Sequence, residues 1–227
     1  MSAQDRIERA RALYERAVFV GDADALPAAE RDLDAVEADL ALARGRILHG
    51  RCLADRDAGR AAGRDTGRAA EEDQRELALF ERAAELYRAL GDPRGEGEAW
   101  FWIGVFHQVI RRDHGAALPA LERSRDLAER SGDPLTLSYA LRHLGIAEHV
   151  AGRLDEARER LTESVRLRRQ VGFLPGVAAN LVGLAYIASG QQRRDDALAL
   201  LAEAGQIAAA TGARAIARQV EEARAQV

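Results

Sequence analysis

The strongest constraint on the fold is a glycine that recurs about every 40 residues in the second half of the chain. Its four copies, at intervals of 41, 40 and 40 residues, are Gly91, Gly132, Gly172 and Gly212. Each glycine closes one segment rich in alanine, leucine and arginine, and another such segment follows at once. A fixed period of this length is typical of a solenoid, in which similar units stack in chain order.

Each repeated unit is predicted to contain two helices. Glycine suits the left-handed position that ends a helix, because it has no Cβ atom to clash. Asp92 and Asp133 can then cap the next helix, since a proline follows each of them at the first helical position. A second break falls in the middle of each unit, at residues 111–113, 152–155 and 190–195. The pattern therefore predicts helix, short turn, helix, short turn.

The spacing of apolar and small residues inside the units resembles the tetratricopeptide repeat. The first helices carry a bulky residue, a leucine-like residue and a glycine, namely Trp100, Ile103 and Gly104, then Leu141, Leu144 and Gly145, then Ala179, Val182 and Gly183. The second helices carry a small alanine and another residue four positions later, namely Ala116 and Ala120, Ala157 and Leu161, and Ala197 and Leu201. The resemblance covers roughly residues 72–227. It implies an all-α, right-handed superhelix of about three and a half helix pairs with helical caps.

The remaining helices follow from the same reasoning. Residues 1–54 are expected to form a capping helix at 5–20 and a long helix at 23–54. The repeat array at 73–227 is expected to have helices near residues 73–90, 94–110, 115–130, 134–151, 155–171, 175–189, 194–210 and 213–226.

Residues 55–72 differ in composition from their surroundings. Glycine and arginine each recur every four residues there, with Arg56, Arg60, Arg64 and Arg68 in register. A helix would present an arginine stripe able to follow phosphates, but three glycines cost roughly 1 kcal/mol each in a helix. A flexible insert between repeats is therefore expected.

The composition excludes several classes of protein. All 33 basic residues are arginine, so Schiff-base catalysis and a phosphate-loop lysine are excluded. The net charge of −4 predicts no general attraction to nucleic acid. Cys52 is the single cysteine, which fits a reducing compartment. The amino terminus is a charged amphipathic segment rather than a signal peptide, and no apolar run suits a membrane, so a cytoplasmic protein is expected.

In tetratricopeptide arrays the first helix of each unit lines a concave groove. Carried over by register, the groove residues are Glu98, Phe101, Val105 and Gln108, then Tyr139, Arg142, Ile146 and His149, then Val177, Asn180, Leu184 and Ile187. This mixture of groups suits a peptide or a small organic ligand with an anionic end, and Arg142 would offer a planar fork to a carboxylate. A solvated groove wall would have the same residues, so both interpretations stay open.

The run Trp100-Phe101-Trp102 cannot point entirely inward. Either Phe101 or Trp102 must face the groove or a neighbouring helix. An exposed aromatic ring on a groove wall would suit a binding hot spot. The same ring could instead pack beneath the helix at 23–54.

The histidines predict no metal site and no cofactor is expected. His107 and His114 share a helical face but lie about 10 Å apart along the helix, too far for one ion. His143 and His149 lie on different faces, and no metal-binding motif occurs.

His107 and Glu148 occupy equivalent, inward positions in consecutive units. With Arg142 and His143 they would form a polar network, which is either structural or the basis of acid–base chemistry.

The sequence thus favours a scaffold that binds a partner peptide or protein segment in its groove. The alternative is a small-molecule sensor or an enzyme with an enclosed pocket around Trp102, His107, Arg142, His143 and Glu148. Phe19 and Val20 belong either to the amino-terminal cap or to an oligomer contact, which leaves a homodimer open.

Overall fold

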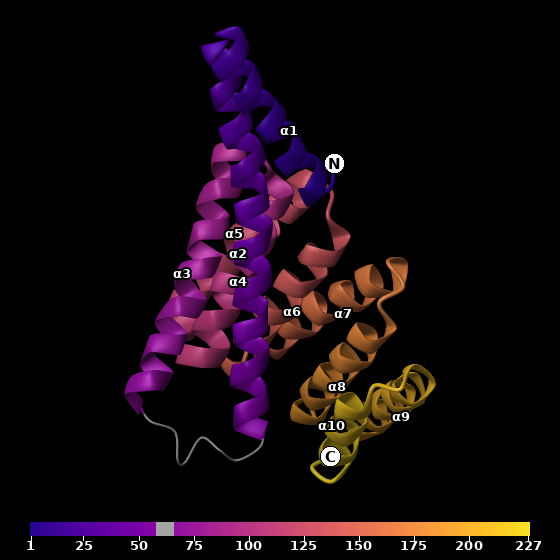
Figure 1. Cartoon of the computed structure of the whole chain (residues 1–227). Helices are drawn as coiled ribbons and strands as arrows, with labels where there is room; N and C mark the ends of the chain where they lie inside the picture. The colour runs from indigo at the N-terminus through magenta and orange to yellow at the C-terminus, as the bar shows by residue number, and fades with distance from the viewer. Residues whose placement is uncertain (58–65) are drawn as a thin grey trace. The chain divides into compact units, whose positions relative to one another are not determined.

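The computed structural model describes residues 1–57 and 66–227, which form helices joined by short turns (Figure 1). These residues contain ten α-helices and no β-strand, which confirms the expected all-α fold. They divide into two compact units, unit 1 (Met1–Asp113) and unit 2 (His114–Val227). No helix in the described ranges is long and apolar enough to cross a bilayer.

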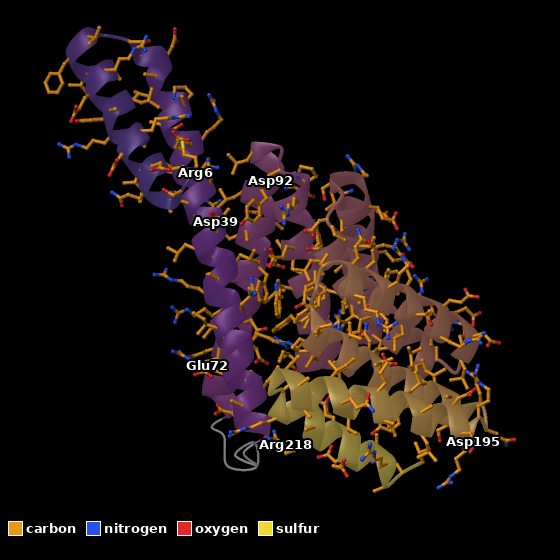
Figure 2. All side chains as sticks on the ribbon, turned by 90° about the vertical axis from the view of Figure 1, so that its right-hand side faces the viewer. Arg6, Asp39, Glu72, Asp92, Asp195 and Arg218 are labelled. Carbon is orange, nitrogen blue, oxygen red and sulfur yellow. The ribbon has the colours of Figure 1, made fainter. Side chains whose placement is uncertain are left out.

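Unit 1 is built on one long helix. Its α-helices are α1 (Ala3–Glu15), α2 (Leu26–Asp57), α3 (Thr66–Leu90) and α4 (Pro93–Val105), and π-helical turns follow α1 and α4. α1 packs on the first part of α2 (Figure 2). Arg6 and Arg9 form ion pairs there with Asp32 at 3.8 and 2.6 Å. α3 packs on the rest of α2, and Arg82 pairs with Glu37 at 2.7 Å.

The middle of α2 approaches α3 and α4 closely. A Cβ atom at Gly45 would lie 2.4 Å from the ring of Phe80, so only glycine fits at this crossing. The ring of Trp102 stacks on Phe80 with 5.7 Å between ring centroids, and the guanidinium of Arg46 lies 5.5 Å from the centre of the Trp102 ring. Trp102 therefore packs against α2, which is the second of the two positions expected for it.

Helices occupy both ends of the segment 55–72 that was predicted as an insert. α2 continues to Asp57 and α3 already begins at Thr66. Residues 58–65 lie outside the described residues, as do the side chains of 56–70, which include the arginine stripe.

Unit 2 contains the regular part of the repeat. Its helices are α5 (His114–Ser131), α6 (Pro134–Val150), α7 (Leu154–Gln170), α8 (Leu174–Gly190), α9 (Arg194–Thr211) and α10 (Arg214–Arg224). Their ends fall within one or two residues of the expected bounds. Each helix packs on the next in chain order, and α10 also packs on α8.

The turns are those that the glycine period predicts. The recurring glycines have left-handed backbones, with φ between 63° and 72° at Gly91, Gly132, Gly172 and Gly212. Asp133 then caps α6 by accepting hydrogen bonds from the backbone N–H groups of Leu135 and Thr136. Two mid-unit turns lack a glycine at the left-handed position, and Arg112 and Gln192 adopt φ values of 54° and 60° there.

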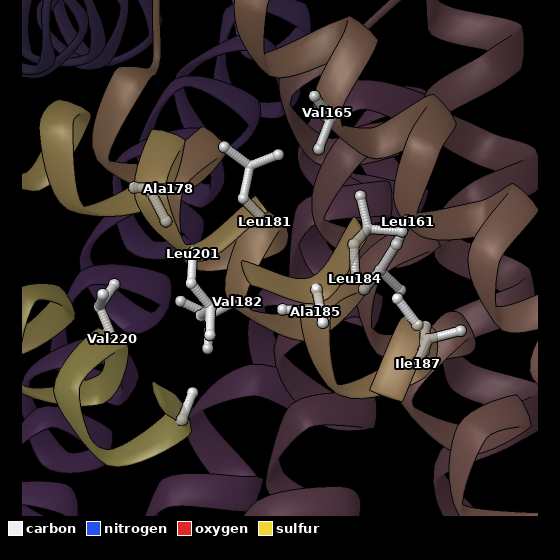
Figure 3. Close-up of a cluster of buried hydrophobic side chains, with 14 of the residues drawn as sticks. Leu161, Val165, Ala178, Leu181, Val182, Leu184, Ala185, Ile187, Leu201 and Val220 are labelled. Atoms are coloured by element: carbon white, nitrogen blue, oxygen red, sulfur yellow. The ribbon is translucent and has the colours of Figure 1, made fainter. Parts of the chain in front are cut away.

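The core of unit 2 depends on close helix contacts. A Cβ atom at Gly145 would lie 2.2 Å from the side chain of Leu161 and 3.2 Å from the carbonyl oxygen of Ala157. α6 and α7 therefore approach at the glycine and alanine of the repeat pattern. Figure 3 shows the apolar cluster that results, which Leu161, Leu181 and Leu201 join from three successive helices.

Candidate binding site in unit 2

A cavity of about 230 Å³ lies between the first helices of two successive repeats. α6 contributes Arg142, Gly145, Ile146 and His149, α7 contributes Leu161, α8 contributes Ala179, Val182, Gly183, Tyr186 and Ile187, and α10 contributes Gln219 and Glu222. Apolar side chains thus form much of the wall, and a few polar groups face a common space. This combination is typical of ligand pockets.

Arg142 is the cation of this cavity. Its Nη1 donates hydrogen bonds to the carbonyl oxygen of Ala179 at 2.9 Å and to Oδ1 of Asn180 at 2.7 Å, so α8 fixes the guanidinium. The guanidinium of Arg142 passes beside Gly183, where a Cβ atom would lie 3.9 Å from Nη1. Glu222 lines the same cavity, but none of the ion pairs in the described residues joins it to Arg142.

A second arginine, which was not predicted as a site residue, shares the acceptor Asn180 with Arg142. Arg168 on α7 is 2% exposed and donates from Nη1 to the carbonyl oxygen of Gly176 at 2.8 Å and to Oδ1 of Asn180 at 3.0 Å. Its guanidinium lies 4.8 Å from the ring centre of Tyr139 and 5.5 Å from that of Phe173. Its Nη2 atom is buried without a hydrogen-bond partner among the described residues.

Asn180 joins the two arginines to a buried hydroxyl group. Its Oδ1 accepts from both guanidinium groups, and its Nδ2 donates to Oγ of Ser164 at 2.7 Å. Ser164 in turn donates to the carbonyl oxygen of Ser138, whose hydroxyl accepts from Nε of Arg168 at 3.3 Å. These hydrogen bonds fix the geometry of the arginines but supply no negative charge.

Arg168 is buried and Arg142 is half-buried, and neither positive charge has a counter-ion among the described residues. Burial lowers the pKa of Arg142 to about 10. Burial and the nearby charge of Arg142 lower the pKa of Arg168 to about 10, while Tyr139 acts in the opposite direction. Both side chains still carry a positive charge at neutral pH, and neither forms an ion pair with a carboxylate of the described residues. An anion in the cavity would therefore be stabilised by Arg142 directly.

The structure brings only part of the predicted groove together in unit 2. Arg142, Ile146 and His149 of α6 line the cavity, as does Ile187 of α8. The other predicted residues lie elsewhere: Tyr139 lies against Arg168, Asn180 and Val177 are fully buried, Leu184 is in the apolar core, and His143 is half-buried outside the cavity.

The register prediction for α8 was wrong for Asn180 and Leu184 as groove-wall residues. Asn180 is 0% exposed and Leu184 is 9% exposed, and neither lines the cavity. The side of α8 that faces α6 carries Ala179, Gly183 and Tyr186 instead. Tyr186 could have been found by asking which residues of α8 face back toward α6.

The groove predicted in unit 1 is also wrong at three positions. Phe101 and Val105 are 3% exposed, because burying an aromatic or aliphatic side chain of this size is favourable by about 1.5–3 kcal/mol. Gln108 is 5% exposed as well. Glu98 forms a salt bridge with Arg46 at 3.0 Å rather than facing a ligand freely.

The five residues of the predicted acid–base pocket do not form one described site. Trp102 and His107 belong to unit 1, whereas Arg142, His143 and Glu148 belong to unit 2. Glu148 forms ion pairs with Arg153 and Arg160 and does not line the cavity. The described residues contain no cluster of three histidine, cysteine or carboxylate side chains able to hold a metal ion.

Comparison with known protein families gives a match for part of unit 2. Residues 136–210, which extend from α6 to α9, match the model of the tetratricopeptide repeat family. Over these residues the match supports the resemblance to the tetratricopeptide repeat that the residue pattern predicted. Repeats of this family indicate a protein-interaction scaffold.

One solved structure shares the fold across nearly the whole chain. It is described as the crystal structure of BtubC (BKLC) from P. vanneervenii, and it is 16% identical over 93% of both chains with a TM-score of 0.51. At this identity the similarity concerns the helical-repeat fold alone. No curated protein matches the sequence.

Proposed function

We propose that the unit 2 cavity binds a carboxylate group of a partner peptide or protein segment. The observation that carries the proposal is Arg142, a cation on the cavity wall that α8 holds in place and that no carboxylate of the described residues neutralises. A guanidinium can bind a carboxylate through two parallel hydrogen bonds, so a fixed arginine also selects geometry.

The rest of the wall supports a peptide as the source of that carboxylate. Ile146, Val182 and Ile187 offer apolar surface for a neighbouring side chain, and Tyr186 adds an aromatic ring. His149 and Gln219 supply hydrogen-bonding groups at the same wall. Binding through a few buried anchors within an apolar wall is the usual way in which a small surface gains affinity.

The test uses a library of short fluorescent peptides that end in a free carboxylate, with the same peptides amidated at that end. We expect a subset of the free peptides to bind the purified chain and their amidated forms to bind at least ten-fold more weakly, a difference of about 1.4 kcal/mol. Arg142→Met should weaken binding to a similar extent. Arg166→Met, which removes an exposed arginine paired with Glu163 on α7, is the matched control and should bind normally.

A second pair of variants keeps the test decisive if Arg142→Met fails to fold. Ile146→Glu adds a negative charge to the cavity wall and should abolish binding, whereas Ile146→Gln should reduce it much less. Equal binding of free and amidated peptides, or no binding by any peptide, would refute the proposal.

A further inference from the structure

Four large apolar side chains of α2 are exposed in a single line. Leu26, Leu33, Leu40 and Ile47 follow one another at intervals of seven residues and are 41, 48, 46 and 56% exposed. The line extends over about 30 Å of helix at 1.5 Å per residue. Contiguous apolar surface of this kind marks an interaction site more often than scattered exposed residues do.

A line of smaller residues lies beside these four large side chains, which are called the large line below. Ala29, Val36, Ala43 and Gly50 each follow a member of the large line by three residues. A Cβ atom added at Gly50 would meet nothing within 4 Å, so the surface is open there. Two apolar lines three residues apart, each with a seven-residue repeat, are the pattern of one helix of a left-handed coiled coil.

The surface continues into a groove between α1 and α2. Ile7, Ala10 and Tyr14 of α1 face Leu26, Ala29 and Leu33 of α2 across a space of about 390 Å³. Ala29 lies at the floor of this groove and is 7% exposed. The groove is therefore deep enough to accept an aliphatic side chain from another helix.

Charged residues beside the large line are separated by sign. Glu30 and Glu37 flank its first half, and Arg44 and Arg51 flank its second half. If two copies of α2 lay antiparallel, the acidic half of each would face the basic half of the other. In a parallel pair the like charges would meet, which is unfavourable.

We propose that α2 pairs antiparallel with α2 of a second copy of this chain. The two-fold axis crosses at the level of Ala38, which sets Leu33 and Leu40 of one copy against Ala43 and Val36 of the other. Ile47 then enters the groove above Ala29, and Leu26 lies over Gly50. In this register Glu30 lies within about two residues, or about 3 Å along the axis, of Arg44 in the other copy. Glu37 lies at the same offset from Glu37 of the other copy, and each of these carboxylates is paired with Arg82 of its own copy at 2.7 Å. Such an interface is isologous and closes with two copies.

The first test is the mass of the full chain in solution, measured by light scattering at micromolar concentrations. We expect a dimer for the wild type and a monomer for the double variant Leu33→Glu, Leu40→Glu, whose circular dichroism should stay helical because both sites are exposed. The matched control is Val150→Glu, a change at a residue of unit 2 that is 64% exposed, which should stay dimeric. A monomeric wild type, or a double variant that stays dimeric, would overturn the proposal.

The second test fixes the direction of the helices by disulfide formation in a Cys52→Ala background. Leu33→Cys combined with Ala43→Cys should give a covalent dimer on oxidation, while each single cysteine should not. Within one copy the two positions are about 15 Å apart along α2, too far for a disulfide. Efficient cross-linking by either single variant would show a parallel pair and overturn the antiparallel arrangement.

Discussion

Replacing Asn180 with aspartate tests whether the two arginines lack a counter-ion. Oδ1 of Asn180 accepts from Arg142 at 2.7 Å and from Arg168 at 3.0 Å, so a carboxylate at this position would meet both cations. With about 4 Å between charge centres and an effective dielectric constant of about 20, each pair gains about 4 kcal/mol. The gross gain is therefore about 8 kcal/mol.

Several costs oppose this gain. A buried carboxylate loses several kcal/mol of hydration. Aspartate also lacks the Nδ2 donor that now bonds Ser164 at 2.7 Å, a loss of about 1–3 kcal/mol. We expect Asn180→Asp to raise the free energy of unfolding by about 1–2 kcal/mol, because an internal carboxylate neutralises both arginines. The same change should abolish binding of carboxylate peptides, since it occupies the charge that they would neutralise.

The assay is urea unfolding followed by far-ultraviolet circular dichroism. Tryptophan fluorescence would not report on this site, because Trp100 and Trp102 both lie in unit 1. The control is Asn180→Leu, which removes the acceptor shared by the two arginines and should lower the free energy of unfolding by about 3 kcal/mol. If Asn180→Asp destabilises the protein as much as Asn180→Leu does, the arginines already have a counter-ion and the reasoning fails.

Two further predictions follow from the same unit. The affinity for a carboxylate peptide, measured by fluorescence anisotropy, should be constant between about pH 7 and 9 and fall as the pH rises through about 10, because Arg142 loses its proton there. The unfolded chain keeps this proton to a higher pH, so the charge destabilises the fold fully below about pH 10, and this cost declines as the pH rises from about 10 toward the pKa of the unfolded chain. An affinity already falling between pH 7 and 9 would contradict the assignment. Gly145→Ala should lower the free energy of unfolding by about 1–3 kcal/mol, because its Cβ atom would lie 2.2 Å from Leu161. Gly205→Ala on α9, where the added Cβ atom would make only ordinary contacts at 3.5 Å or more, should raise it by up to about 1 kcal/mol, so equal effects in thermal unfolding would contradict the packing argument.

The fold was predictable because the residues that end helices recur. Glycine at the left-handed positions and aspartate followed by proline, as at Asp92 and Asp133, depend on backbone geometry that is local in sequence. The helix ends in unit 2 therefore follow from short-range rules. The bounds of α2 and α3 were less accurate, because glycine content alone does not say where a helix stabilised by packing will stop.

The site was only partly predictable because it depends on contacts between helices. Arg142 could be chosen from its register in the repeat, but its hydrogen bonds to Ala179 and Asn180 require the position of α8. Arg168 was missed because an arginine on a second helix normally faces solvent. The signal that could have found it is the set of small polar residues at core positions, Ser138, Ser164 and Asn180, which must satisfy one another when buried. The peptide partner and a cytoplasmic location stay predictions.

Because Arg142 and Arg168 share only the neutral acceptor Asn180, a bound anion should be detectable through its effect on the stability of the protein. Because no carboxylate of the described residues pairs with these two cations, an anion that binds beside them would also stabilise the folded structure. By mass action, a ligand present at 100 times its dissociation constant adds about 2.7 kcal/mol to stability. A screen that measures the melting temperature with small carboxylic acids and acidic peptides would therefore rank candidate ligands before the natural ligand is identified.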